Sequence, residues 1–103
     1  MYYLYVIECK DDSLYTGICK NLEKRWKEHQ NGIASKYTRA KGVKTLLCAW
    51  QISESRSEAQ KAEFAFKACS KKQKLDFIYQ NTLTFSYGKS YQKVKVSPNT
   101  FIQ

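Results

Sequence analysis

The sequence has few of the features that would place this chain in a membrane or mark it for secretion. No apolar run approaches the roughly 18 residues that a membrane span needs. The apolar stretch at the start of the chain has no basic segment before it, as a secretory signal would have. We therefore expect a cytoplasmic protein with no membrane partner.

Cysteine and histidine are too sparse and too scattered to predict a structural metal. The four cysteines are widely spaced, no two of them form a CxxC pair, and the chain has one histidine. Structural zinc sites need such ligands clustered at short spacing. In a cytoplasmic chain we expect free, buried thiols rather than disulfides.

Acidic residues are scarce, and the net charge of +9 is distributed unevenly along the 103 residues. Residues 1–19 carry a net charge of −2, whereas residues 20–44 hold eight Lys and Arg against two Glu, a net +6. No acid follows Asp76. This asymmetry favours a polyanionic partner such as nucleic acid, although a merely soluble basic surface would have the same composition.

Apolar patterning and turn residues predict elements in the order β-β-α-β-α-α. The expected strands are 2–9, 14–19 and 44–52, and the expected helices begin after N-cap residues at Asn21, at Ser55 or Ser57, and at Ser70, ending near residues 30, 69 and 79. We predict an α+β fold with a small three-stranded antiparallel sheet flanked by helices. Residues 33–43 are expected to form a basic loop.

One domain is expected over residues 1–81, followed by a polar basic C-terminal tail over residues 82–103. The tail contains the only proline, Pro98, and no acid. A chain of this length has room for one modest core.

Glu63 is the first candidate for chemistry, because it lies on or beside the apolar stripe of its predicted helix. That stripe contains Ala59, Ala62, Phe66 and Cys69. A carboxylate is rarely buried without a partner. Glu63 is therefore either a glutamate at the edge of the stripe that reaches solvent or a lysine, or a ligand for a hard cation such as Mg²⁺.

Arg25 and His29 are four residues apart on the first predicted helix, so their side chains lie on adjacent turns. His29 shares a face with Leu22, Trp26 and Ile33. It is either a hydrogen-bonded core residue or a catalyst. Arg25 is either a surface residue or a planar donor for a phosphate.

Tyr5 and Tyr15 share a face of the first hairpin if its loop is Asp11-Asp12-Ser13. Cys9 then pairs with Tyr15, Ile7 with Gly17, and Tyr5 with Cys19. A four-residue loop would place the two tyrosines on opposite faces.

These segments together resemble the GIY-YIG nuclease family, and most of all its small stand-alone UPF0213 (YhbQ-like) branch. The resemblance covers residues 2 to about 80 and rests on five segments in order: Tyr3-Leu4-Tyr5-Val6-Ile7, Tyr15-Thr16-Gly17, Asn21 to His29, Ala34 to Arg39, and Arg56 to Glu63. Two variations depart from the literal motif, since Tyr3 stands at the glycine of GIY and the second motif reads YTG.

The resemblance implies a metal-dependent endonuclease that hydrolyses phosphodiester bonds in DNA, in repair or recombination. Tyr5, Tyr15 or His29 would help to activate the attacking water, and Arg25 would stabilise charge on the scissile phosphate. Glu63 would hold one Mg²⁺ or Mn²⁺ ion. A tyrosine is a poor base unless nearby positive charge lowers its pKa, which the ion and Arg25 would do.

Substrate binding is expected at Gly17, Lys36, Tyr37 and Arg39. We expect nucleic acid as the partner, DNA rather than RNA, and a protein partner is one route to specificity because the chain has no room for a separate DNA-binding domain. The competing hypotheses are a non-catalytic nucleic-acid-binding module and an interaction domain on the same scaffold.

Overall fold

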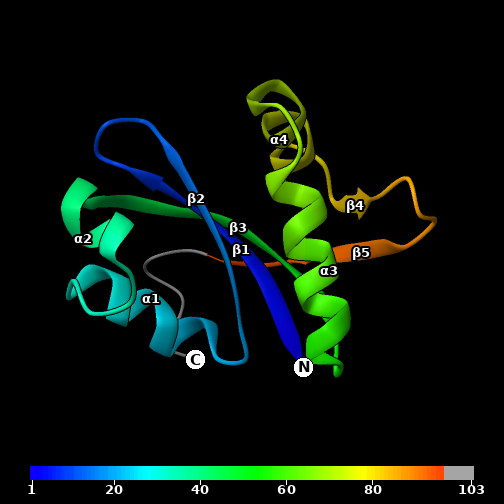
Figure 1. The fold of residues 1–103 in the computed structure, drawn as a ribbon, viewed down its shortest axis with the longest axis horizontal. Coiled ribbons are helices and arrows are strands. Elements are labelled where there is room, and N and C mark those ends of the chain that lie inside the picture. The colour runs from blue at the N-terminus through cyan, green and yellow to red at the C-terminus, as the bar shows by residue number, and fades with distance from the viewer. Residues whose placement is uncertain (97–103) are drawn as a thin grey trace.

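The computed structural model describes residues 1–96, which form four helices and five strands (Figure 1). No helix in this range is long and apolar enough to cross a membrane. In chain order the elements are β1 (Tyr2–Cys9), β2 (Leu14–Cys19), α1 (Leu22–Gln30), α2 (Lys36–Lys41), β3 (Val43–Ser53), α3 (Arg56–Lys67), α4 (Lys71–Ile78), β4 (Thr82–Thr84) and β5 (Ser90–Val94).

The fold is α+β with an antiparallel sheet, as predicted, but the sheet has five strands rather than three. Their order is β2-β1-β3-β5-β4. β5 adds to β3 through the pairs Ala49↔Val94 and Trp50↔Lys93, and β4 pairs with β5. The prediction of a tail from residue 82 is therefore wrong as far as residue 96. Residues 97–103, which include Pro98, lie outside the described part of the chain.

The two added strands belong to the core because their side chains alternate between apolar and polar. Leu83, Phe85 and Tyr91 are buried, whereas their neighbours Thr84 and Ser90 are exposed. This alternation is the pattern of a half-buried strand. The domain thus extends past Asn81, and its core depends on residues that follow the predicted boundary.

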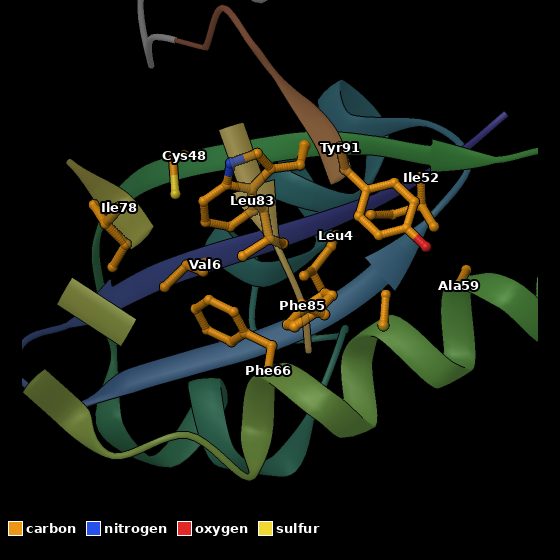
Figure 2. Packing of buried hydrophobic residues seen from close by; sticks show 12 residues of the cluster. Leu4, Val6, Cys48, Ile52, Ala59, Phe66, Ile78, Leu83, Phe85 and Tyr91 are labelled. Atoms are coloured by element: carbon orange, nitrogen blue, oxygen red, sulfur yellow. The ribbon is translucent and has the colours of Figure 1, made fainter. Parts of the chain in front are cut away.

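The sheet has helices on both faces, and successive residues of β1 point to opposite ones. In Figure 1, α3 and α4 lie on one side of the β1–β2–β3 strands, and α1 and α2 lie on the other. Figure 2 shows the larger cluster, in which Phe66 points from α3 toward the strands near Val6. The smaller cluster contains Tyr5 and Trp26, so Tyr5 faces α1.

The hairpin register differs from the predicted one by two residues. Ile7 pairs with Tyr15, Tyr5 with Gly17 and Tyr3 with Cys19. The turn begins one residue earlier than predicted, since the Cys9 amide donates to the Ser13 carbonyl over 2.8 Å and so encloses residues 10–12, where Asp12 has a φ of 69°. A shift of two residues keeps every side chain on its predicted face. Tyr5 and Tyr15 therefore do share one face.

The helix starts follow their N-cap residues. Asn21, Ser55 and Ser70 each accept a hydrogen bond from a first-turn amide, and Ser70 forms a capping box with Gln73. The predicted basic loop is wrong in part, because Ser35 caps the short helix α2 and Gly42, with a φ of 75°, ends it. Ile33 does not continue the buried face of α1, since it is 73% exposed.

Candidate active site

Four aromatic rings gather where β1, β2, α1 and α2 meet. The ring of His29 lies 5.5 Å from that of Tyr5 and 5.2 Å from that of Tyr15, both in edge-to-face orientation. Tyr37 stacks on Tyr15 at 5.8 Å and is 40% exposed. The cluster therefore extends from the buried side of the sheet to the surface.

Gly17 makes this arrangement possible, because the ring of Tyr5 lies over it. A Cβ atom at position 17 would be 2.5 Å from the Tyr5 hydroxyl oxygen and 2.7 Å from its Cζ. Such distances are far below van der Waals contact. The group that lies against Gly17 is therefore Tyr5, its cross-strand partner, and substrate binding at Gly17 stays a prediction.

A buried chain of hydrogen bonds connects Tyr5 to α2. The Tyr5 hydroxyl lies 2.7 Å from His29 Nε2, and His29 Nδ1 lies 2.8 Å from Thr38 Oγ1. Thr38 Oγ1 in turn lies 2.9 Å from Ser35 Oγ. Tyr5, His29 and Thr38 are 3%, 2% and 1% exposed. Both nitrogens of the imidazole are therefore paired inside the protein.

Burial shifts the pKa values of the Tyr5–His29 pair in the directions that keep both side chains neutral. It lowers the pKa of His29 to about 4, and the Arg25 charge adds to that effect. Burial also raises the pKa of Tyr5, with a further contribution from Tyr15. Arg25 acts to lower the pKa of Tyr5. The effect of burial is larger, so the pKa of Tyr5 is raised and not lowered as expected.

Arg25 lies at the rim of the site. Its Nη1 donates to Glu28 Oε1 over 3.1 Å, and its side chain is 38% exposed. Together with Cys19, Lys20 and Lys24 it lines a shallow depression. Its positive charge acts to lower the pKa values of both Tyr5 and His29.

Glu63 approaches the same pair from α3. Its negative charge is the smallest contribution to the raised pKa of Tyr5. The side chain is 24% exposed, and Oε2 lies 3.2 Å from Lys67 Nζ. The structure thus shows the pairing with a lysine, and the role of Glu63 as a metal ligand stays a prediction.

Glu63 offers one carboxylate to a metal ion. No group of three or more Cys, His, Asp or Glu that could hold an ion occurs within residues 1–96. These residues therefore do not supply a complete set of protein ligands for a metal ion. A single carboxylate fits Mg²⁺, which keeps several waters and commonly shares its remaining positions with substrate phosphate.

The other predicted residues lie on α2, at differing distances from the rings. Tyr37 joins the cluster, as described above. Lys36 and Arg39 are exposed and line a separate shallow depression with Gly32 and Ser35. Thr38 is the residue that sequence reasoning missed, although its spacing from Ser35, three residues earlier, marks a helix N-terminus.

Comparison with known proteins agrees with this arrangement of motifs. Residues 1–76 match the GIY-YIG catalytic domain. A UPF0213 protein of Clostridium perfringens is 43% identical over 83 residues, which cover 81% of this chain and 88% of that protein. A UPF0213 protein of Bacillus licheniformis is 42% identical over 94 residues, which cover 91% of this chain and 93% of the relative.

A solution NMR structure of a UPF0213 protein from Bacillus halodurans is also similar. It has 36% sequence identity and a TM-score of 0.47, and the alignment covers 76% of this chain and 83% of that one. The match over residues 1–76 identifies a GIY-YIG domain, a class that belongs to an endonuclease superfamily. The chain belongs to the GIY-YIG family, in the branch of the UPF0213 proteins.

Proposed function

We propose that this chain is an endonuclease that hydrolyses phosphodiester bonds in DNA with one divalent metal ion, Mg²⁺ or Mn²⁺. The observation that carries the proposal is the hydrogen-bonded Tyr5–His29 pair, with the charges of Arg25 and Glu63 close enough to shift the pKa of Tyr5. Phosphodiester hydrolysis needs an acceptor for the proton of water, a cation for the developing charge and a Lewis acid.

The Tyr5–His29 pair is the proposed proton acceptor. His29 is neutral at pH 7 because its pKa is about 4, so the imidazole keeps a basic nitrogen at that pH. Tyr15 borders the pair and is half-buried, which places it between the buried rings and the exposed Tyr37. Tyr15 is therefore the neighbour suited to orient a water or a phosphate oxygen.

Arg25 and Glu63 supply the two charges in this proposal. The guanidinium of Arg25 is partly exposed and pairs with Glu28 through one nitrogen, so other N–H groups remain for phosphate oxygens. Glu63 would hold the ion, which when bound would act as a Lewis acid on a phosphate oxygen. Lys67 now pairs with that carboxylate and would have to release it.

Basic side chains make nucleic acid the proposed substrate. Residues 20–44, which include α1 and α2, carry a net charge of +6, and this segment borders the ring cluster. Lys36, Arg39 and Lys41 are exposed on α2. Lys41 also lies 5.6 Å from the Tyr37 ring. Phosphate contacts from such side chains would make binding strongly dependent on salt.

A non-catalytic nucleic-acid-binding module is the second candidate. Two observations favour it: both nitrogens of His29 are paired inside the protein, and Glu63 is paired with Lys67. On this account the buried chain stabilises the fold, and the basic surface binds nucleic acid without cutting it. The repair or recombination setting and the cytoplasmic location stay predictions under either candidate.

Cleavage of a panel of labelled DNA and RNA substrates with Mg²⁺ or Mn²⁺ tests the proposal. Wild type, Arg25→Ala, Glu63→Ala and the matched control Glu54→Ala are compared at low salt. Glu54 is an exposed glutamate beside α3 that pairs with the N-terminus, so its loss should not affect cleavage. We expect cutting by wild type and Glu54→Ala only, and only with metal.

Other results would contradict the proposal in separate ways. Equal cutting by all four proteins would indicate a contaminating nuclease. Tight, salt-sensitive binding without cutting would favour the binding module. Preference for RNA would keep the activity and overturn the DNA assignment.

A further inference from the structure

We propose that Thr38 is a positioning residue that fixes the tautomer of His29, holding the imidazole with its proton on Nδ1 so that Nε2 accepts a hydrogen bond from the Tyr5 hydroxyl. The evidence is the buried chain from Tyr5 through His29 and Thr38 to Ser35. The consequence for catalysis rests on the proposed function, whereas the tautomer does not.

The direction of the chain follows from counting donors. A neutral imidazole has one N–H donor and one acceptor nitrogen, and a hydroxyl has one hydrogen to donate. Within residues 1–96 the Tyr5 hydroxyl has one hydrogen-bond partner, His29 Nε2. If Nε2 carried the proton, the hydrogen of a 3% exposed phenol would have no acceptor in that range. An unpaired buried polar group is costly.

The remaining hydrogen bonds, from His29 to Ser35, can run in the same direction. His29 Nδ1–H donates to Thr38 Oγ1 over 2.8 Å, which leaves the Thr38 hydrogen free to donate onward. Ser35 Oγ lies 2.9 Å from Thr38 Oγ1 and also accepts from the Thr38 amide over 3.1 Å. Since a hydroxyl oxygen has two lone pairs, Ser35 Oγ can accept both bonds. The donors of Tyr5, His29 and Thr38 therefore each have an acceptor. The Ser35 carbonyl oxygen, 3.5 Å from Thr38 Oγ1, is a second acceptor for the Thr38 hydrogen.

This geometry gives α2 a role in the site beyond its exposed basic residues. Thr38 is the buried residue of α2, and Ser35 is its N-cap. The helix that carries Lys36 and Arg39 on its surface thus sets the orientation of the imidazole from its inner side. With the proton on Nδ1, the lone pair on Nε2 is directed at Tyr5. A proton passed from the phenol would be received at Nε2, while the Nδ1–H bond to Thr38 stays in place.

The low pKa of His29 makes the tautomer observable at neutral pH. Burial lowers that pKa to about 4, so the ring is neutral at pH 7 and one nitrogen carries the proton. His29 is the single histidine of the chain, so histidine-selective ¹⁵N labelling yields one pair of ring signals without any assignment step. The chemical shifts of the two nitrogens distinguish the protonated one.

The experiment compares full-length wild type with Thr38→Val, which removes the hydroxyl at nearly constant volume, and with Thr38→Ser, which keeps it. Thr84→Val is the matched control, because Thr84 Oγ1 pairs with Ser90 Oγ on the β4–β5 hairpin, away from His29. We expect the Nδ1–H form in wild type, Thr38→Ser and Thr84→Val. Thr38→Val should show a substantial share of the Nε2–H form.

Two results would overturn the proposal. One is an Nε2–H tautomer in wild type, which needs no variant to detect. The other is an unchanged Nδ1–H tautomer in a folded Thr38→Val protein. If Thr38→Val fails to fold, wild type and Thr38→Ser decide the question, since loss of the Nδ1–H form in either would refute it.

Cleavage measurements separate this inference from the proposed function. If the chain is a nuclease, Thr38→Val should reduce the cleavage rate roughly ten- to hundredfold with substrate affinity unchanged. Thr38→Ser should restore most of the rate. If wild type does not cut, but the Nδ1–H form is reduced in Thr38→Val, the positioning role of Thr38 is supported and the proposed nuclease activity is refuted.

Discussion

Replacing Gly17 by alanine should disrupt the centre of the site without replacing any proposed catalytic side chain. The new Cβ would lie 2.5 Å from the Tyr5 hydroxyl oxygen and 2.7 Å from Cζ. Because carbon atoms pack at about 3.5–4.0 Å, the ring would have to retreat by about 1 Å. The hydroxyl is bonded to His29 at 2.7 Å, and a retreat of that size would break the bond.

The expected cost combines two effects. Overpacking of a buried site costs about 1–3 kcal/mol, and leaving buried polar atoms unpaired costs about 1–3 kcal/mol more. Since both arise from one displacement they will not add fully, and we expect a loss of about 2–4 kcal/mol in the free energy of unfolding. Backbone strain is not part of this loss, because Gly17 has no positive φ, unlike the three other glycines.

Denaturant unfolding of a double-mutant cycle with Tyr5→Leu measures this loss and its cause. Leucine lacks the Cε, Cζ and hydroxyl atoms that the new Cβ would meet. In the Tyr5→Leu background, Gly17→Ala should therefore cost little or nothing. An equal penalty in both backgrounds, or a penalty below about 0.5 kcal/mol in wild type, would refute the steric reasoning.

Three further predictions concern pH, the added strands and the exposed ring. The pKa of His29 is about 4 in the folded protein and near 6.5 in the unfolded chain, so the unfolded chain binds more protons between these pH values. The free energy of unfolding should therefore keep the full contribution of His29 above pH 6.5 and fall by about 3 kcal/mol as the pH drops to 4. Unfolding of wild type against His29→Gln checks this, and an identical pH dependence would contradict it. Leu83→Ala should lower the free energy of unfolding by about 2–5 kcal/mol, because Leu83 is buried. The fragment 1–81 should show no folded structure by circular dichroism, and a folded fragment would support the predicted domain boundary at residue 81. Tyr37→Ala should weaken nucleic-acid binding severalfold or more, whereas Tyr79→Ala, which removes a ring that is 84% exposed, should not; equal effects in a salt-controlled binding assay would remove Tyr37 from the interface.

The parts of the fold that the sequence predicted well are those with local causes. Asn21, Ser55 and Ser70 each precede an amphipathic run, and all three cap helices. A shared face for Tyr5 and Tyr15 was predicted for a three-residue loop and is found, although the register was shifted by two residues. The exact turn depends on the backbone of the hairpin loop, which the residue types leave open.

The missed elements depend on contacts between distant segments. β5 has five residues and β4 three, and β5 pairs with β3 through Ala49↔Val94 and Trp50↔Lys93, residues that are far apart in the sequence. The polar residues of β4 and β5 favoured the prediction of a tail, because half of the side chains of each strand face solvent. Thr38 was missed for a similar reason. Its partner His29 lies across the α1–α2 connection, and nothing in a single threonine indicates burial.

The most direct test of the proposed activity is single-turnover cleavage of labelled DNA with Mg²⁺ by wild type, Glu63→Gln and the matched variant Glu23→Gln. Glutamine keeps the shape of the side chain and removes its charge, and Glu23 pairs with a lysine one helical turn away on α1, as Glu63 does on α3. We predict metal-dependent cutting by wild type and Glu23→Gln, with that of Glu63→Gln reduced at least a hundredfold, as is typical for loss of a catalytic charge. Undiminished cutting by Glu63→Gln, or no cutting by wild type, would contradict the proposal that this site is a metal-dependent nuclease.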